Sequence, residues 1–247
     1  MIKFIILNIL KYFDLFHQLK MFKFLKQKGL SKFEIFFDIG AHRGETIKLF
    51  TKNFKIEKIY SFEPSKINFD YLKKNSLKFN KTKKNIKIII ENFAFGDKNN
   101  DIKIKHLSES SSSTINEIDT SSKYFKKKSF FLYKNKNNKF YKEENTKQKK
   151  LCDYILDNKI SKIDFLKIDT EGYEMKVLLG LEKEFKNVSI IMFEHHFNNM
   201  IMKNYKFRDI NNLLKINNFI QIYKYKMPFR KTFEYIYVRR DRLKVLV

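Results

Sequence analysis

The 247-residue chain contains a single cysteine, Cys152, and this scarcity excludes several classes of protein. One cysteine cannot form an intramolecular disulfide framework or a cysteine-based zinc site, and it is compatible with a reducing cytoplasm. Long apolar runs are also missing near the N-terminus, where the longest charge-free stretch covers residues 4–10. A membrane-spanning helix needs roughly 20 apolar residues, and no cleavage site of the secretory type follows this stretch. We therefore expect a cytoplasmic protein.

Arginine is scarce as well, although the formal charge of the chain is +25. Such a charge ordinarily suggests nucleic acid or an anionic surface as a partner. Proteins that read phosphates and bases depend on the planar fork of arginine, yet only six of the 52 basic residues are arginines. We therefore attribute most of the charge to a compositional drift towards lysine, and we treat nucleic acid as an unlikely partner.

Residues 1–30 are mixed apolar and basic, and we expect them to form a helical extension that ends near Gly29 and Ser31. Two placements of this extension stay open. It can pack on the main domain, or it can lie on an anionic membrane as an interfacial helix. The second placement predicts peripheral contact with the inner face of the membrane.

From residue 35 onward, apolar strand patterns alternate with helical patterns, which is typical of a parallel sheet flanked by helices. We expect strands at 35–39, 56–62, 86–90, 163–168 and 188–193, and helices at 46–54, about 67–79, 151–156, 175–179 and 207–216. The last two strands, 219–225 and 233–238, are close enough in sequence to form an antiparallel hairpin. Residues 98–150 interrupt the pattern with Ser-, Lys- and Asn-rich segments, and we interpret them as an insertion with one or two extra strands over the ligand side.

The first strand leads into a turn with two glycines, Asp-Ile-Gly-Ala-His-Arg-Gly at 38–44. Glycines carry no Cβ, so the backbone of such a turn can approach a ligand closely. The turn lacks the Gly-x-Gly-x-x-Gly dinucleotide fingerprint, which argues against a nicotinamide-dependent dehydrogenase. An acid at the first glycine position repels a pyrophosphate but suits a ligand with an ammonium group, such as S-adenosylmethionine. We expect cofactor contacts from Asp38, Gly40, Ala41, His42 and Gly44.

Polar clusters also follow the later strands, and ligands of open α/β sheets bind outside these carboxyl ends. The clusters are Glu63, residues 92–94, residues 169–172 and residues 194–196. Glu63 follows the second strand, where an acid can accept hydrogen bonds from both ribose hydroxyls. Asn92 and Ala94 are expected to offer a polar edge and an apolar face to the adenine.

Four motifs together resemble the FkbM family of methyltransferases. They are DIGAHRG at 38–44, SFEP at 61–64, FLKIDTEGYEMKVLLG at 165–180 and MFEH at 192–195. The resemblance runs from about residue 33 to 237 and implies the class I methyltransferase fold, a Rossmann-like α/β fold. Its seven-stranded, mostly parallel sheet ends in an antiparallel C-terminal hairpin. A methyltransferase domain at 31–247 would then follow the extension at 1–30 and carry the insertion at about 98–150.

The resemblance also implies a function, because family members are O-methyltransferases that often act on sugars, glycolipids or polyketide-like products. We expect S-adenosylmethionine as the cofactor and a hydroxyl of a sugar, glycolipid or polysaccharide precursor as the acceptor. The alternatives are a nucleic-acid methyltransferase and a non-catalytic, membrane-associated binding module. The chain departs from the family at His42, where asparagine is common, and at Cys152, which splits a Leu-Asp pair. Residues 108–150 match poorly beyond 112–114, so the acceptor stays open.

Methyl transfer to a hydroxyl needs a general base, and histidine is the usual choice at neutral pH. We predict that His195 is this base and that Glu194 or Glu171 orients it. For Asp169 three roles stay open: contact with the methionine ammonium, service as the base, or cation binding together with Glu171. We assign no metal ligand.

Overall fold

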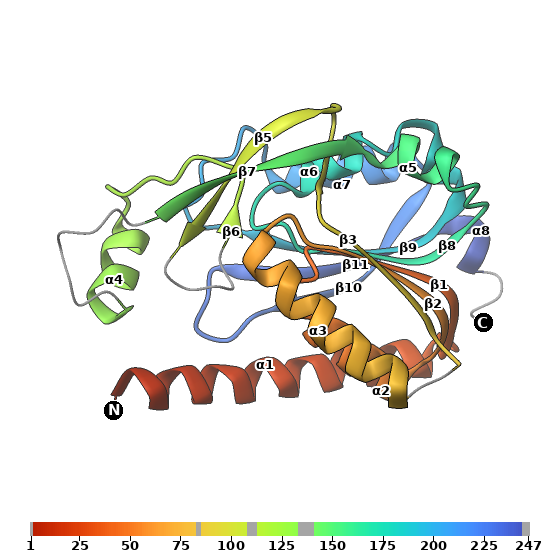
Figure 1. The fold of residues 1–247 in the computed structure, drawn as a ribbon, viewed down its shortest axis with the longest axis horizontal. Helices are drawn as coiled ribbons and strands as arrows, with labels where there is room; N and C mark the ends of the chain where they lie inside the picture. Colours follow the sequence, from red (N-terminus) through yellow and green to blue (C-terminus); the bar gives the residue numbers. More distant parts are fainter. Residues whose placement is uncertain (1, 83–84, 108–112, 133–140, 244–247) are drawn as a thin grey trace.

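A seven-stranded sheet forms the centre of the computed structural model, which describes residues 2–82, 85–107, 113–132 and 141–243 (Figure 1). Its strand order is β10-β11-β9-β8-β1-β2-β3. The bounds are β1 Lys32–Ile39, β2 Lys55–Phe62, β3 Lys87–Glu91, β8 Ile163–Ile168, β9 Val188–His196, β10 Phe219–Lys226 and β11 Thr232–Arg239. Strands β3, β2, β1, β8 and β9 run parallel, whereas β11 is antiparallel to both neighbours. The mostly parallel sheet with an antiparallel C-terminal hairpin is therefore confirmed.

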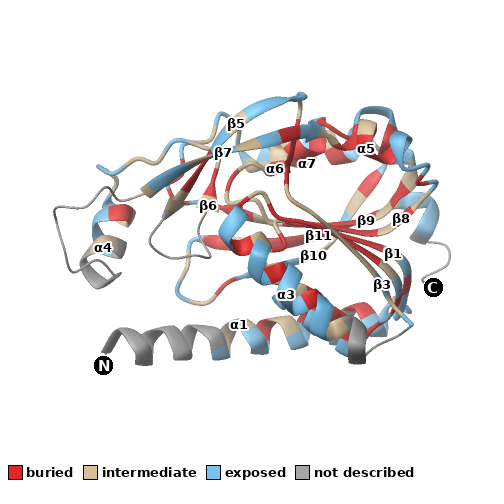
Figure 2. Cartoon of the chain, viewed as in Figure 1, coloured by how far each residue is buried: buried red, intermediate tan, exposed pale blue. Residues whose placement is uncertain are grey.

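Helices cover both faces of this sheet, and the pleat of the strands explains why both faces are apolar. On β1, Phe36 packs into the cluster under α1 (Ile2–Gln27) and α2 (Glu45–Asn53), while Phe37 packs into the cluster on the opposite face. The helix α3 (Lys66–Thr82) lies on the side of α1 and α2. The opposite face carries α5 (Leu151–Asp157), α6 (Glu174–Leu179), the short 3₁₀ helix η1 (Glu182–Asn187) and α7 (Phe207–Ile216). Figure 2 shows the buried strands between the two helical layers.

The N-terminal helix α1 packs on the domain through the second half of its length. Met21, Phe22 and Leu25 are almost fully buried in the core cluster beneath the sheet. The Phe22 ring meets the Phe50 and Phe54 rings edge-on at centroid distances of 5.1 and 5.2 Å. Within the described chain, no helix is both long and apolar enough to cross a bilayer.

The insertion, together with residues 94–96 before it, forms a second, smaller sheet with the strand order β4-β7-β5-β6. Its strands are β4 Ala94–Gly96, β5 Asn100–Leu107, β6 Ser113–Thr114 and β7 Tyr141–Lys150, and the helix α4 spans Lys123–Leu132. The insertion was predicted to hold one or two extra strands, and two long ones, β5 and β7, pair along the whole length of β5. The helix α4 was not predicted, because its lysine-rich segment has little apolar periodicity. Most of the serine run, at 108–112, lies outside the described residues.

Candidate active site

A cavity of about 1800 Å³ opens at the carboxyl edge of the central sheet. Its walls come from the ends of β1, β2, β8 and β9, from residues 93–95, from the insertion and from α1. The predicted convergence of the strand-end clusters is therefore confirmed for this edge. The cavity also reaches the connection between β10 and β11. The individual predicted residues do not all face it.

Gly40 allows the turn after β1 to lie against the end of β8. Its φ is +81°, and a Cβ at this position would lie 1.9 Å from the carbonyl oxygen of Asp169. The amides of Gly40 and Ala41 both donate to the carbonyl of Phe62, at 2.9 and 3.0 Å. Gly44, with φ +91°, precedes α2, and a Cβ there would lie 3.2 Å from Leu72 Cδ1. The space that a Cβ would take at these two glycines is thus filled by Asp169 and Leu72. Of the predicted turn residues, Gly40, Ala41 and His42 line the cavity and Gly44 does not.

Glu63 is the acid at the end of β2, and its buried carboxylate holds the neighbouring loops in place. Its Oε2 accepts the amide of His42 at 2.8 Å, and its Oε1 accepts the amide of Ser65 at 3.0 Å. Burial raises the pKa of Glu63 to about 7, against the opposing effect of these two amides. Glu63 and His42 both line the cavity. Within the described chain, Nε2 of His42 is buried without a hydrogen-bond partner.

Asp38 lies beneath the glycine turn and does not line the cavity. Burial raises the pKa of its carboxyl to about 6, and its nearest cation is Lys167, whose Nζ is 3.5 Å from Oδ1. The same Nζ lies 3.0 Å from Oδ2 of Asp169, which does line the cavity. Burial raises the pKa of Asp169, but Lys167 outweighs this effect and lowers it. Of these two carboxylates, that of Asp169 lines the cavity and that of Asp38 does not, so Asp38 is not placed for the direct cofactor contact that we expected.

Asn92 shapes the end of β2 and does not line the cavity. Its amide nitrogen donates to the carbonyl oxygens of Glu63, at 2.8 Å, and Pro64, at 3.1 Å. Ala94 does line the cavity, together with Phe93. Of the residues expected to contact the adenine, Ala94 therefore lines the cavity. The side-chain amide of Asn92 instead bonds the backbone after β2.

The turn after β8 is held by Glu174, a residue whose role sequence analysis missed. Its buried carboxylate accepts the amide of Gly172 at 2.8 Å and the hydroxyl of Tyr205 at 2.6 Å. Glu171 has a left-handed φ of 50°, and its carbonyl accepts the hydroxyl of Thr114 at 2.8 Å. The signal was present in the Asp-Thr-Glu-Gly-Tyr-Glu motif, where the final acid follows the turn. This network holds the backbone of Glu171, whose side chain lines the cavity.

His195 points away from the cavity because β9 continues to His196, three residues beyond the predicted end at 193. Successive side chains of a strand face opposite sides, so Glu194 and His196 share the cavity side. The His195 ring lies among aromatic rings, 4.7 Å from that of Phe197 and 5.8 Å from that of Phe207. Burial lowers the pKa of His195 to about 3. The base expected at His195 is therefore corrected: at the end of β9, the histidine that lines the cavity is His196.

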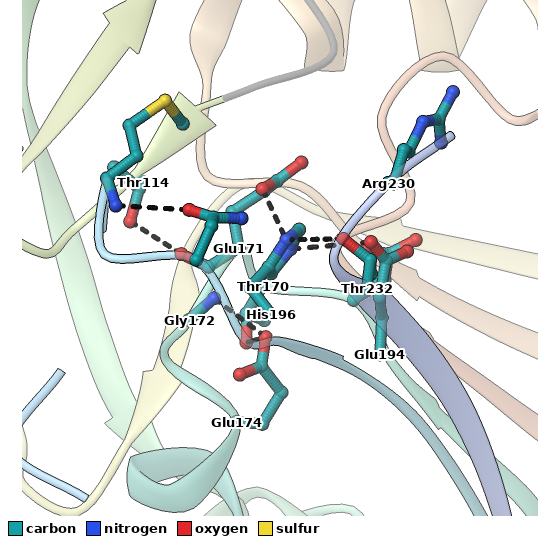
Figure 3. Close-up of polar contacts among 12 residues, drawn as sticks. Thr114, Thr170, Glu171, Gly172, Glu174, Glu194, His196, Arg230 and Thr232 are labelled. Carbon is teal, nitrogen blue, oxygen red and sulfur yellow. Dashed lines mark hydrogen bonds and ion pairs between the residues drawn. The ribbon is translucent and has the colours of Figure 1, made fainter. Parts of the chain in front are cut away.

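His196 lies between two carboxylates at the cavity wall (Figure 3). Its Nε2 is 3.1 Å from Oε2 of Glu171 and 3.3 Å from Oε1 of Glu194, and its Nδ1 is 3.1 Å from the hydroxyl oxygen of Thr232. Burial lowers the pKa of His196, but the two carboxylates outweigh it and raise the pKa to about 9. Burial, and then the charge of Asp169, raises the pKa of Glu194 well above its ordinary value. The cluster can hold and release a proton.

Comparisons with known structures agree with this architecture. Methyltransferase FkbM from Methylobacillus flagellatus KT superimposes with a TM-score of 0.51 at 16% identity, over 83% of this chain and 44% of that one. Magnesium protoporphyrin IX methyltransferase (ChlM) from Synechocystis PCC 6803, solved with bound SAM, gives 0.50 at 10% identity, over 95% and 81%. The chain thus spans less than half of the Methylobacillus protein. At these identities the likeness shows the fold.

Sequence comparison identifies the family. No curated protein sequence matches the chain. The sequence model of the methyltransferase FkbM domain matches residues 38–226, which is more than half of the chain and runs from the glycine turn to the end of β10. The protein belongs to the FkbM family of methyltransferases.

Proposed function

We propose that this protein is an S-adenosylmethionine-dependent O-methyltransferase whose acceptor is a hydroxyl of a sugar, glycolipid or polysaccharide precursor. The observation that carries the proposal is the position of His196 between Glu171 and Glu194, in the cavity that also exposes Glu63. Family membership supports methyl transfer, and the related fold of ChlM, solved with bound SAM, supports the cofactor.

The cofactor end of the cavity offers groups that fit S-adenosylmethionine, which supplies an electrophilic methyl group when bound. Asp169 is kept ionised by Lys167 and suits the methionine ammonium. Each oxygen of Glu63 accepts one backbone amide and has a lone pair left for a ribose hydroxyl. The unpartnered Nε2 of His42 can bond a polar group of the ligand, and Ala94 supplies an apolar surface for the adenine.

His196 is the proposed general base at the acceptor end. An imidazole that takes the hydroxyl proton becomes positively charged, and the carboxylates of Glu171 and Glu194 stabilise that charge. Thr232 faces the other ring nitrogen and helps to fix the plane of the ring. A positioned base of this kind contributes roughly 10²- to 10⁴-fold to the rate, and much of the remainder is positioning of the two reactants.

A methyl-transfer assay tests the proposed function. Deuterated S-adenosylmethionine is incubated with the protein and with extracted glycans, glycolipids and RNA, and the products are examined by mass spectrometry. The proposal expects a labelled methyl ether in the glycan or glycolipid fraction. A label confined to RNA, together with RNA binding that weakens steeply with salt, would favour a nucleic-acid methyltransferase.

We also propose that the reaction takes place in the cytoplasm and that residues 1–30 contact the inner face of the membrane.

A further inference from the structure

The helix α1 has an apolar side that the domain does not cover. Tyr12, Leu15, Phe16 and Leu19 are 70%, 42%, 49% and 48% exposed. Their spacing of three and four residues places them on one side of the helix, opposite the buried Met21. Single exposed apolar side chains are ordinary, but a stripe of large ones along a helix indicates a contact surface. We call this stripe, together with Lys23 and Lys26, the outer face.

The outer face becomes basic towards the end of the helix. Lys23 and Lys26 are exposed and continue the same helical side, 11 and 14 residues after Tyr12. Lys20 borders the stripe, and its ammonium lies 4.6 Å from the centre of the Phe16 ring. Asp14 is the one acid among residues 12–27, and it forms an ion pair at 2.9 Å with Arg230. The surface is therefore apolar and cationic, with no unpaired acid in the described half.

The contacts on the inner side of α1 hold the helix in place, so the outer face is available without any rearrangement. The His17 ring stacks on the Tyr225 ring at a centroid distance of 4.0 Å, and its buried Nε2 contacts the Glu234 side chain of β11. Phe13 packs edge-on against Phe229 at 5.3 Å. These contacts tie α1 to the β10–β11 hairpin.

The cavity reaches this helix. Asp14 and Gln18, on the inner side of α1, line the cavity, and so does Phe229, which is 77% exposed. The Phe229 ring packs on Phe13, so this part of the cavity wall is in direct contact with α1. A surface that holds the outer face would therefore also lie near one end of the candidate active site.

We infer that the outer face of α1 rests on an anionic lipid bilayer, with the cavity on the other side of the helix. Apolar side chains that enter the headgroup region, flanked by lysines that meet anionic lipids, are the features that hold an interfacial helix. The basic end favours an anionic lipid surface over a second copy of this strongly basic chain. The inference rests on α1 and does not depend on the proposed reaction.

Vesicle co-sedimentation of the full chain tests this inference, with phosphatidylcholine vesicles that contain or lack phosphatidylglycerol. The wild-type protein is expected to bind the anionic vesicles and to bind neutral ones far more weakly. Tyr12→Ser/Leu15→Ser/Phe16→Ser/Leu19→Ser should weaken binding by at least about tenfold, because the apolar area is lost. The matched control Ile67→Ser/Leu77→Ser/Leu156→Ser/Ile216→Ser changes four exposed apolar side chains elsewhere and should bind like wild type.

A charge-reversal variant keeps the test decisive if the quadruple variant does not fold. Lys23→Glu/Lys26→Glu changes two exposed side chains and should lower binding to anionic vesicles while circular dichroism stays unchanged. The inference is overturned if the wild-type protein does not bind anionic vesicles. It is also overturned if the outer-face variants fold and bind these vesicles as strongly as the wild-type protein and the matched control. Light scattering that shows a dimer lost in the outer-face variants, without vesicle binding, would assign the face to a second copy instead.

Discussion

Nε2 of His196 lies 3.1 Å from Oε2 of Glu171, although the two residues are 25 positions apart in the sequence. They meet because β8 and β9 are parallel neighbours, so the turn after β8 and the end of β9 reach the same edge of the sheet. The left-handed backbone of Glu171 and the carboxylate of Glu174 shape that turn. The contact sets the charge of the candidate base and is the basis of the first predictions.

Replacement of His196 should slow methyl transfer and leave the cofactor site intact. His196→Ala removes the proposed base, so we expect a loss of roughly 10²- to 10⁴-fold in kcat with little change in the Kd for S-adenosylmethionine. His195→Phe is the matched control, since His195 lies among aromatic rings outside the cavity. Initial rates and titration calorimetry measure both quantities. An equal loss of kcat in the two variants would contradict the role of His196.

The pH dependence of rate and stability should reflect the raised pKa of His196, about 9. A base must be deprotonated, so the rate should rise with pH and level off above about 9. The ion pairs of the imidazolium stabilise the fold fully below its ordinary pKa of about 6.5 and are lost as the pH rises through 9. Thermal melting should show a decrease in Tm over this window in wild type and a smaller one in His196→Gln. Identical pH profiles in the two proteins would exclude His196 as the titrating group.

Glu63→Ala should weaken cofactor binding. A carboxylate that accepts ribose hydroxyls contributes about 1.5–3 kcal/mol for each hydrogen bond to a charged group, so the Kd should rise at least about tenfold. Because burial raises the pKa of Glu63 to about 7, the wild-type affinity should also increase as the pH rises through 7. Glu57→Ala, on the same strand but at the exposed ion pair with Lys32, is the control and should leave the Kd unchanged. Unchanged affinity in Glu63→Ala would remove this residue from the cofactor site.

Two glycines with similar backbone angles allow the cost of left-handed backbone strain to be measured apart from the cost of a steric clash at the site. Gly29 and Gly40 have φ of +74° and +81°, but an added Cβ meets nothing within 4 Å at Gly29 and lies 1.9 Å from Asp169 O at Gly40. Gly29→Ala should therefore cost only the left-handed backbone strain, about 1 kcal/mol of unfolding free energy. Gly40→Ala should cost clearly more, because the turn must move off β8. Urea denaturation of both variants measures the difference, and equal costs would show that the turn relaxes freely.

Most of the fold followed from the sequence because the periodic patterns are local. The apolar runs of β1, β2 and β8 and the hairpin of β10 and β11 appear at the predicted places. It was harder to predict which side chains line the cavity, because their orientation depends on contacts between segments that are distant in the sequence. Asp38 was expected to face the ligand, but Lys167 from the neighbouring strand holds it below the surface. His195 was predicted to be the base, but β9 continues to His196 through its pairing with β11, and His195 faces the other side of the sheet.

The most direct test of the account is calorimetric titration of the full chain with S-adenosylmethionine and, separately, with a nicotinamide dinucleotide. We expect saturable binding of S-adenosylmethionine at one site per chain, weakened in Glu63→Ala and retained in His196→Ala. We expect no binding of the dinucleotide. Absence of S-adenosylmethionine binding by the folded protein would contradict the account.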